Sequence, residues 1–255
     1  MNLQMPGDLA HSYKSPSQQT RVVSEAWGEE NLFCPCCDSN SLTRSAPNKE
    51  AIDYVCPRCD DPFQLKSHAT WFAAKIVDAA YEAMKRAVVT GQTPNLLALH
   101  YDRTQWQVIN LIVVPRFAYS LSVIEKRRPL GPNARRAGFV GCNILLSNIP
   151  PDARIPVVQD GVARDPDAVR EQYSRLRPLE KVRHEARGWT LDVLNVVRGL
   201  GRAEFSLADV YASAAHLAWL HPANRYIEPK IRQQLQVLRD LGLVEFLGRG
   251  RYRTT

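Results

Sequence analysis

The sequence lacks any apolar segment long enough to cross a lipid bilayer. Its most hydrophobic run, VINLIVV at 108–114, has the length of a buried strand, whereas a membrane-spanning helix needs about 20 apolar residues. The first residues, MNLQMPGDLAHSYKS, also lack the apolar core of a secretory signal peptide. These absences exclude a membrane protein and predict a soluble, cytoplasmic one with no membrane partner.

Acidic residues are fewer than basic ones, 26 against 33, which gives a formal net charge of +7 and a pI of about 9.2. A positive excess favours polyanionic partners such as nucleic acids. Basic residues gather in EKRRPLGPNARR at 125–136 and GRGRYR at 248–253, where glycine and proline indicate turns. Solvated loops can look similar, so the charge supports DNA as a partner without establishing it.

The 255 residues, 45% of them hydrophobic, are enough for two domains, which we place at 1–183 and 184–255. Strands with interspersed helices predict a mixed α/β fold with a buried central sheet in the first domain. The strands are expected at 49–56, 61–67, 95–102, 107–115, 138–147 and 155–160. The helices are expected at 15–30, 75–90 and 165–176. The polar segment 177–188 is interpreted as an interdomain connector.

The second domain is expected to be a winged helix, because three helices precede a terminal hairpin. The expected elements are 190–200, 206–220, 228–242 and the hairpin 243–255. The third helix should turn its apolar side to the core with Ile231, Leu235 and Leu238. Its outer face then carries Arg232, Gln233, Gln236 and Arg239.

Arginine and glutamine on such a face suit the reading of guanine and adenine in the major groove. The hairpin adds Arg249, Arg251 and Arg253, which are placed to reach phosphates. The alternatives are a solvated helix face and a winged helix that binds protein.

The cysteines predict a zinc site, because two C-x-x-C pairs with 18 residues between them supply four thiolates: Cys34 with Cys37 and Cys56 with Cys59. A disulfide framework is the alternative, but a reducing cytoplasm disfavours it. Cys36 lies inside the first pair and could compete as a ligand. Four cysteines leave zinc no open position, so the ion is expected to be structural.

Three polar side chains next to the second cysteine pair are expected to share one surface of a hairpin. Gln64 and Lys66 lie two residues apart on one strand and so face the same side, and Asp53 lies on the preceding strand. An acid, a neutral oxygen and an ammonium group could hold Mg²⁺ and orient water at a phosphodiester. An ordinary polar strand face is the alternative, because this spacing alone is a weak signal.

The pattern Asp53…Gln64-Leu65-Lys66 resembles the PD-(D/E)XK nuclease signature, and the chain resembles the DpnI family of methyl-directed restriction endonucleases over nearly its whole length. The similar stretches are SYKSPSQQ, CPCC, DYVCPRCDDPFQLKS, RRPLGPNARRAGFVGCNILLS, VQDGVARDP, RGWTLDVLN and IRQQLQVLRDLGLVEFLGRGRYR. The resemblance implies a PD-(D/E)XK domain with a zinc knuckle followed by a winged helix. It further implies a bacterial enzyme that cuts double-stranded DNA at GATC carrying N6-methyladenine.

By the same resemblance, Asp53, Gln64 and Leu65 form the Mg²⁺ site and Lys66 is the catalytic lysine. Gln64 departs from the family, which has glutamate there. An amide oxygen can coordinate Mg²⁺ but adds no negative charge, so metal affinity should fall. The alternative function is therefore a non-cleaving reader of adenine-methylated DNA.

The RRAGF segment, residues 135–139, is expected to recognise the methyl groups of the adenines. Arg135 and Arg136 are expected to anchor phosphates or bases, and Phe139 falls where the resembled family offers an aromatic wall to the adenine methyl groups. Phe139 as a core aromatic at a strand start is the alternative. The chain has no evident dimerisation segment, so we expect a monomer.

Overall fold

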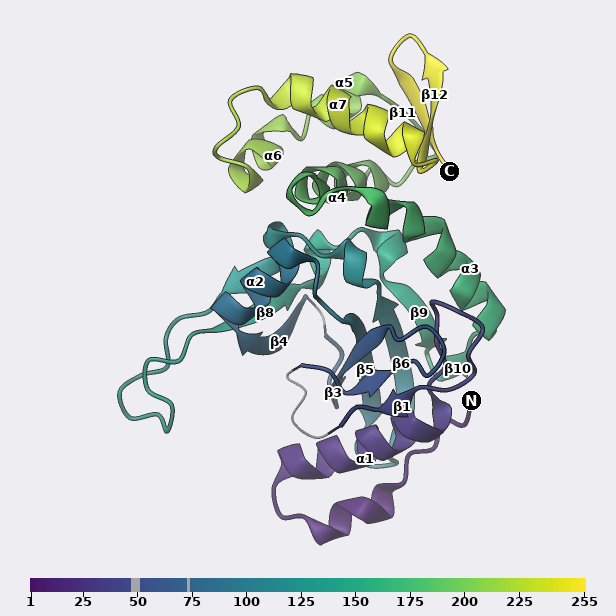
Figure 1. The fold of residues 1–255 in the computed structure, drawn as a ribbon, viewed down its shortest axis with the longest axis vertical. Helices are drawn as coiled ribbons and strands as arrows, with labels where there is room; N and C mark the ends of the chain where they lie inside the picture. Colours follow the sequence, from purple (N-terminus) through teal and green to yellow (C-terminus); the bar gives the residue numbers. More distant parts are fainter. Residues whose placement is uncertain (47–50, 73) are drawn as a thin grey trace. The chain divides into compact units, whose positions relative to one another are not determined.

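The computed structural model describes residues 1–46, 51–72 and 74–255, which form two compact units (Figure 1). The first unit comprises Met1–Ala74, Pro94–Arg116 and Arg154–Ser174, and the second comprises Lys75–Thr93, Phe117–Ala153 and Arg175–Thr255. Strands and helices alternate along the chain, so the predicted mixed α/β class is confirmed. Among the described residues, no helix is long and apolar enough to span a membrane.

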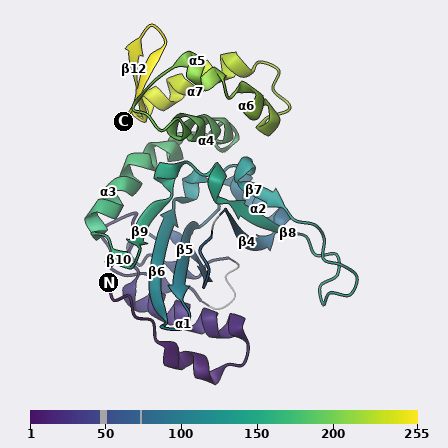
Figure 2. The same cartoon turned by 180° about the vertical axis from the view of Figure 1, so that it is seen from behind.

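The first unit is built on a seven-stranded mixed sheet with the strand order β1-β2-β3-β5-β6-β9-β10. β3 and β5 are parallel, and every other neighbouring pair is antiparallel. Figure 2 shows β5, β6 and β9 side by side. The strands are β1 (Thr43–Arg44), β2 (Tyr54–Val55), β3 (Pro62–His68), β5 (Asn95–Asp102), β6 (Gln107–Val114), β9 (Ile155–Gln159) and β10 (Val162–Ala163).

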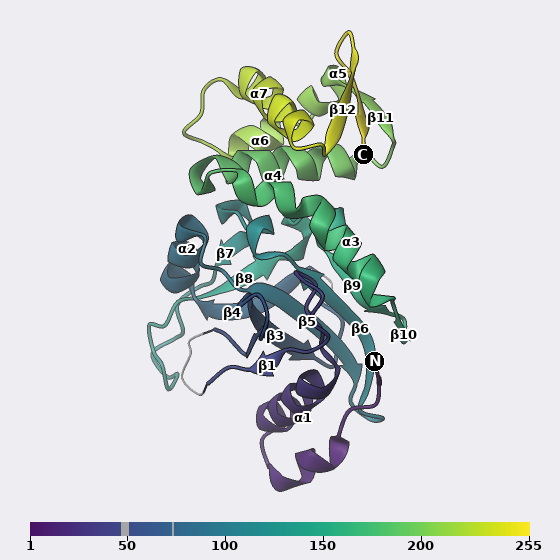
Figure 3. The ribbon, with the colours of Figure 1, turned by 45° about the vertical axis from the view of Figure 1, so that its right-hand side comes forward.

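The central strands are apolar along their length because the sheet is buried on both sides. In β5, the four residues from Leu96 to Leu99 are at most 2% exposed. Helix α1 (Pro16–Asn31) packs against β3 and buries Val23 and Trp27 completely (Figure 3). A continuous apolar strand of this kind is typical of the middle of a covered sheet.

The second unit begins with a separate three-stranded sheet in the order β4-β8-β7. Its elements are β4 (Lys75–Ala80), α2 (Tyr81–Thr90), β7 (Ile124–Lys126) and β8 (Gly141–Leu145). The segment between β7 and β8, residues 127–140, projects from this hairpin as a long loop (Figures 1 and 2). The predicted strand 138–147 therefore belongs to this small sheet and not to the central one.

The helix predicted over 75–90 is wrong in its first part, because residues 75–80 form strand β4. Ile76 and Asp78 are buried and Val77 is 59% exposed, which is the alternation of a strand. Antiparallel pairing with β8 sets Ile76 opposite Ile144 and Asp78 opposite Cys142. Pairing with a strand distant in sequence thus outweighs a local pattern that also fits a helix.

The carboxyl-terminal part has winged-helix order, as predicted. Its elements are α4 (His184–Gly199), β11 (Glu204–Ser206), α5 (Leu207–Tyr211), α6 (Ala214–Leu220), α7 (Ile227–Asp240), β12 (Val244–Gly248) and β13 (Arg251–Thr254). β13 pairs with both β11 and β12. The predicted inward positions of α7, Ile231, Leu235 and Leu238, are all 0% exposed.

Two predictions for this part need correction. The single helix expected at 206–220 is two helices, α5 and α6, and the first starts with a capping box between Ser206 and Asp209. The expected connector 177–188 is largely helical, because α4 begins at His184 and Arg177–Lys181 form a short 3-10 helix. The Arg187 side chain of that segment is buried and donates to the backbone oxygens of Glu180 and Val182.

Most remaining elements follow the sequence pattern. Strands 95–102 and 107–115 and the helix 15–30 are confirmed to within a residue or two, and the helix 165–176 appears as α3 (Pro166–Leu176). The predicted strand 49–56 falls partly on residues 47–50, which lie outside the described residues, and is regular only at Tyr54–Val55. Short 3-10 helices occur at Gly7–Ser12, Arg116–Ala118, Leu121–Val123, Leu146–Asn148 and Pro151–Ala153.

Candidate active site, zinc site and DNA-binding surface

The strand pairing of β2 with β3 brings Asp53 beside the Gln64-Leu65-Lys66 segment. Tyr54 pairs with Phe63, so Asp53 falls next to Gln64 in the register. The backbone N–H of Leu65 donates to Asp53 Oδ2 at 2.7 Å, and Asp53 N–H donates to the Phe63 carbonyl at 2.9 Å. These bonds fix the Asp53 carboxylate against the middle of β3.

Asp53, Leu65 and Lys66 line one pocket of about 170 Å³. The rest of its wall comes from Ser67 and from one side of α1: Ser17, Thr20, Arg21, Ser24 and Glu25. Gln64 is only 7% exposed and is not among the described residues that line this pocket. The structure therefore brings Asp53 and Lys66 to a common space and leaves the Gln64 amide buried beside it.

The environment of Asp53 opposes its negative charge. Burial is the main cause that raises the pKa of this carboxyl group, and the nearby Glu25 charge raises it further. The Leu65 N–H and the Lys66 ammonium act in the opposite direction but do not cancel the rise. A divalent cation would relieve this cost, and carboxylate oxygens are the ligands that Mg²⁺ prefers, so the residues present fit such an ion.

Glu25 is the one carboxylate besides Asp53 in the described lining of this pocket, and no motif in the sequence predicted it. Its side chain is 13% exposed and pairs with Arg21 at 2.6 Å and with Arg44. The available signal was a polar stripe on α1, since Ser17, Arg21 and Ser24 recur at helical spacing on an otherwise half-buried helix.

The four predicted zinc ligands come together, with one sulfur atom each within 4.8 Å of the others: Cys34, Cys37, Cys56 and Cys59. The Sγ atoms of Cys34 and Cys59 are 3.7 Å apart, and those of Cys37 and Cys56 are 3.5 Å apart. Such separations fit a tetrahedral ion with Zn–S bonds of about 2.3 Å. The cluster is compatible with structural zinc. Cys36 is buried outside it, where its sulfur accepts from Asn95 Nδ2 at 3.8 Å.

The Arg170 side chain of α3 donates hydrogen bonds to the loop that carries Cys34 and Cys37. Its Nε donates to the carbonyl oxygens of Cys34 and Cys37 at 3.2 and 2.9 Å, and Nη2 donates to the carbonyl of Ser39 and to Asn40 Oδ1 at 3.0 and 2.9 Å. One guanidinium thus donates to three backbone carbonyls of a loop without regular structure, of which only that of Ser39 is also seen to accept from a backbone N–H, that of Cys34.

Replacing Arg170 by glutamine should lower the free energy of unfolding by about 2–3 kcal/mol, because several acceptors lose their donor in a half-buried site. Chemical denaturation measures this change. Asp167→Asn is the matched control, since it removes only the ion pair of Arg170 with an 86% exposed carboxylate and should change stability by a few tenths of a kcal/mol, about the worth of a surface pair. Equal losses in both variants would show that the carbonyl contacts contribute little.

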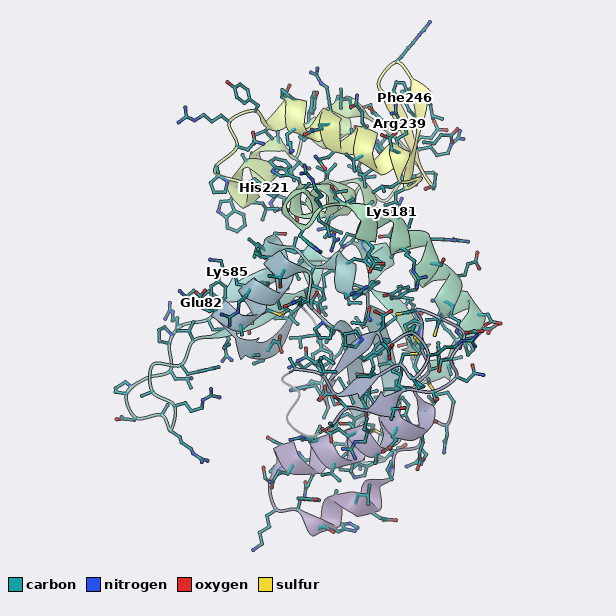
Figure 4. All side chains as sticks on the ribbon, in the orientation of Figure 1. Glu82, Lys85, Lys181, His221, Arg239 and Phe246 are labelled. Carbon is teal, nitrogen blue, oxygen red and sulfur yellow. The ribbon has the colours of Figure 1, made fainter. Side chains whose placement is uncertain are left out.

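The outer face of α7 is exposed, as predicted for a DNA-reading helix. The exposed residues are Arg232, Gln233, Gln236 and Arg239. Figure 4 labels Arg239 near the end of this helix and Phe246 on β12 of the wing. Gln234, on the opposite side, is 2% exposed and accepts from Thr190 Oγ1 at 2.7 Å, which ties α7 to α4.

The arginines of the wing differ in their surroundings. Arg251 and Arg253 both pair with Glu204 of β11 at 2.9 Å, and Arg253 also pairs with Glu245. Arg249 is exposed in the turn between β12 and β13, with a left-handed φ of 49°. The tip of the wing therefore presents Arg249, while the other two lie along the sheet.

The loop 127–140 carries the predicted methyl-reading residues. The Arg136 guanidinium lies 4.0 Å from the centre of the Phe139 ring, a cation–π contact. Phe139 is half-buried and precedes β8, and both Arg135 and Arg136 are exposed. Phe139 is thus not a fully buried core side chain.

Two family models match this chain, one over each predicted domain. The model of the DpnI, or Dam-replacing, family matches residues 1–182. The model of the Dam-replacing HTH domain matches residues 185–254, the winged-helix part. These matches, to a restriction endonuclease family and to its HTH domain, indicate DNA as the partner of the protein. The chain belongs to the DpnI family of restriction endonucleases.

Proposed function

We propose that the protein cuts double-stranded DNA at GATC sites carrying N6-methyladenine, by Mg²⁺-dependent hydrolysis of the phosphodiester bond. Residues 1–183, with a PD-(D/E)XK active site, perform the cleavage, and residues 184–255 bind DNA. The observation that supports this function most strongly is the convergence of Asp53 and Lys66 on one pocket in a member of this family.

Each residue of the predicted motif, Asp53 and Gln64 to Lys66, has a chemical role in this proposal. Asp53 supplies the charged oxygen ligand, Leu65 lines the same site, and Gln64 offers a neutral oxygen at most. The Mg²⁺ ion, when bound, supplies Lewis acidity at the scissile phosphate. Lys66 orients the attacking water and offsets the negative charge that develops on the phosphate. The four thiolates hold zinc and with it the turn that follows β2.

Methylated DNA is recognised by two surfaces in this proposal. Phe139 offers its ring to the apolar methyl groups of adenine, as side chains do to the thymine methyl, and Arg135 and Arg136 anchor the backbone. On the winged helix, Arg232, Gln233 and Gln236 face the major groove, and Arg249 and Arg251 approach phosphates. The protein acts as a monomer.

A matched pair of plasmids tests this function. Plasmid from a host that methylates GATC should be cut in a Mg²⁺ series, and the same plasmid without methylation should stay intact. Cutting of both plasmids would contradict methyl direction. The buried, neutral Gln64 favours a second function, a reader that binds adenine-methylated DNA without cutting it. Methylation-dependent binding without product at any Mg²⁺ or Mn²⁺ concentration would support the reader.

A further inference from the structure

We propose that Glu25 supplies the second carboxylate of the divalent-metal site, in place of the acid that position 64 lacks. The inference deepens the proposed function and rests on it for the identity of the site. It concerns a residue on α1, 28 positions before Asp53, that no spacing in the sequence connects with the Asp53…Lys66 pattern.

The position of Glu25 relative to Asp53 is fixed by Tyr54, the neighbour of Asp53. The Tyr54 hydroxyl donates to the backbone carbonyl of Glu25 at 2.7 Å, and the Tyr54 side chain is 0% exposed. Gly28, one turn further along α1, lies so close that a Cβ atom there would stand 2.4 Å from the Tyr54 hydroxyl oxygen. The helix can therefore approach this tyrosine only with glycine at that place, and the approach sets Glu25 at the pocket wall.

The two carboxylates act on each other. Both side chains line the same pocket of about 170 Å³. Two like charges at a partly buried site are costly unless a cation lies between them or beside them. The charged residues of this pocket are two acids, a lysine and Arg21, and the two carboxylates have the donor type of a hydrolytic Mg²⁺ site.

Gln64 does not compete for this role. Its amide is neutral, its side chain is 7% exposed, and it is outside the described lining of the pocket. Without Glu25, the pocket would hold one negative charge, from Asp53, against the positive charges of Lys66 and Arg21. Glu25 therefore restores the charge that a glutamate at position 64 would have provided.

The arginines that pair with Glu25 leave room for a cation. Arg21 contacts Oε1 and Arg44 contacts Oε2, and their side chains are 74% and 44% exposed. Ion pairs of such exposed arginines contribute little to stability. A divalent ion can therefore bind a further lone pair of the Glu25 carboxylate oxygens or displace one guanidinium.

Mn²⁺ binding to the full-length, zinc-containing protein tests the inference without using cleavage. Electron paramagnetic resonance of free Mn²⁺ gives the dissociation constant of the wild type and of Glu25→Gln, Gln64→Glu and the double variant. Glu25→Gln should weaken Mn²⁺ binding about tenfold or more. A loss of about tenfold is typical when a residue that only hydrogen-bonds to a metal ligand is replaced, and the loss of a ligand should cost at least as much. Adding Gln64→Glu to Glu25→Gln should restore less affinity than Glu25 provides, because the side chain at position 64 is buried and outside the described lining of the pocket.

Arg21→Gln is the control for the ion pair, because it removes a partner of Glu25 and keeps the carboxylate. It should bind Mn²⁺ as tightly as the wild type or more tightly. Wild-type affinity in Glu25→Gln, or weaker binding in Arg21→Gln, would overturn the inference. The results also separate this inference from the proposed function. If the wild type cuts methylated plasmid and Glu25→Gln binds Mn²⁺ with unchanged affinity, only the role of Glu25 is refuted. If the wild type leaves methylated plasmid uncut and its Mn²⁺ binding depends on Glu25, only the nuclease function is refuted.

Discussion

Replacing Lys66 by alanine should slow the cutting of adenine-methylated plasmid by about a thousandfold or more. Lys66 lines the same pocket as Asp53, and in the proposed function its ammonium offsets the charge that develops on the phosphate. Removing one preorganised donor or proton-handling group from an active site typically costs two to four orders of magnitude in rate, so about 10³ is the expected size. Initial rates on supercoiled plasmid at saturating Mg²⁺ measure the loss.

Binding separates this effect from a loss of recognition. The Lys66→Ala variant should bind methylated DNA nearly as well as the wild type, because the proposed reading surfaces lie on other segments of the chain. Lys85→Ala is the matched control, since Lys85 is an exposed lysine of α2 with no role in the proposal (Figure 4). Cutting at the wild-type rate by Lys66→Ala would show that the hydrolytic site lies elsewhere.

Loss of zinc should have the largest effect on stability. Cys56 is 0% exposed within the four-cysteine cluster, and a structural zinc site of this kind contributes about 10 kcal/mol or more in isolated zinc-binding peptides. Cys56→Ser should therefore release the ion and lower the melting temperature by about 10 °C or more, since each kcal/mol moves the midpoint by about 2–4 °C in a chain of this size.

Metal analysis and thermal melts check this result together. Purified wild type should carry one zinc ion per chain and Cys56→Ser none. Cys36→Ser is the control, because Cys36 is a neighbouring buried cysteine outside the cluster, and its zinc content should not change. A full complement of zinc in Cys56→Ser would mean that other groups bind the ion.

The predictable parts of the fold are those whose local sequence pattern fits only one type of secondary structure. β5 and β6 are apolar runs too short for anything but buried strands, and α7 repeats its apolar residues at one helical spacing. β4 was missed because residues 75–90 fit a helix throughout, and only pairing with Gly141–Leu145 selects the strand. That partner is more than sixty residues away, and a local pattern carries no information about it.

The same distinction applies to the candidate sites. The cysteine spacing predicted its cluster because the ligands come in adjacent pairs, and their convergence needs only one hairpin. Glu25 could not be found in this way, since it reaches the Asp53 pocket only after α1 has packed against β3. Arg170 likewise contacts Cys34 and Cys37 from more than 130 positions away. Such contacts depend on tertiary packing, and tertiary packing cannot be inferred from the local pattern of a single sequence.

The short length of β2 limits where this protein can tolerate insertions and deletions. Only Tyr54 and Val55 separate Asp53 from Cys56, and Tyr54 also holds α1 through its hydroxyl group. Inserting or deleting one residue here would turn every following side chain to the other side of the strand. Asp53, the Tyr54 hydroxyl group and the Cys56 thiol would then lose their present alignment. Length variation during divergence should consequently be tolerated in the loops on either side of this dipeptide but not within it.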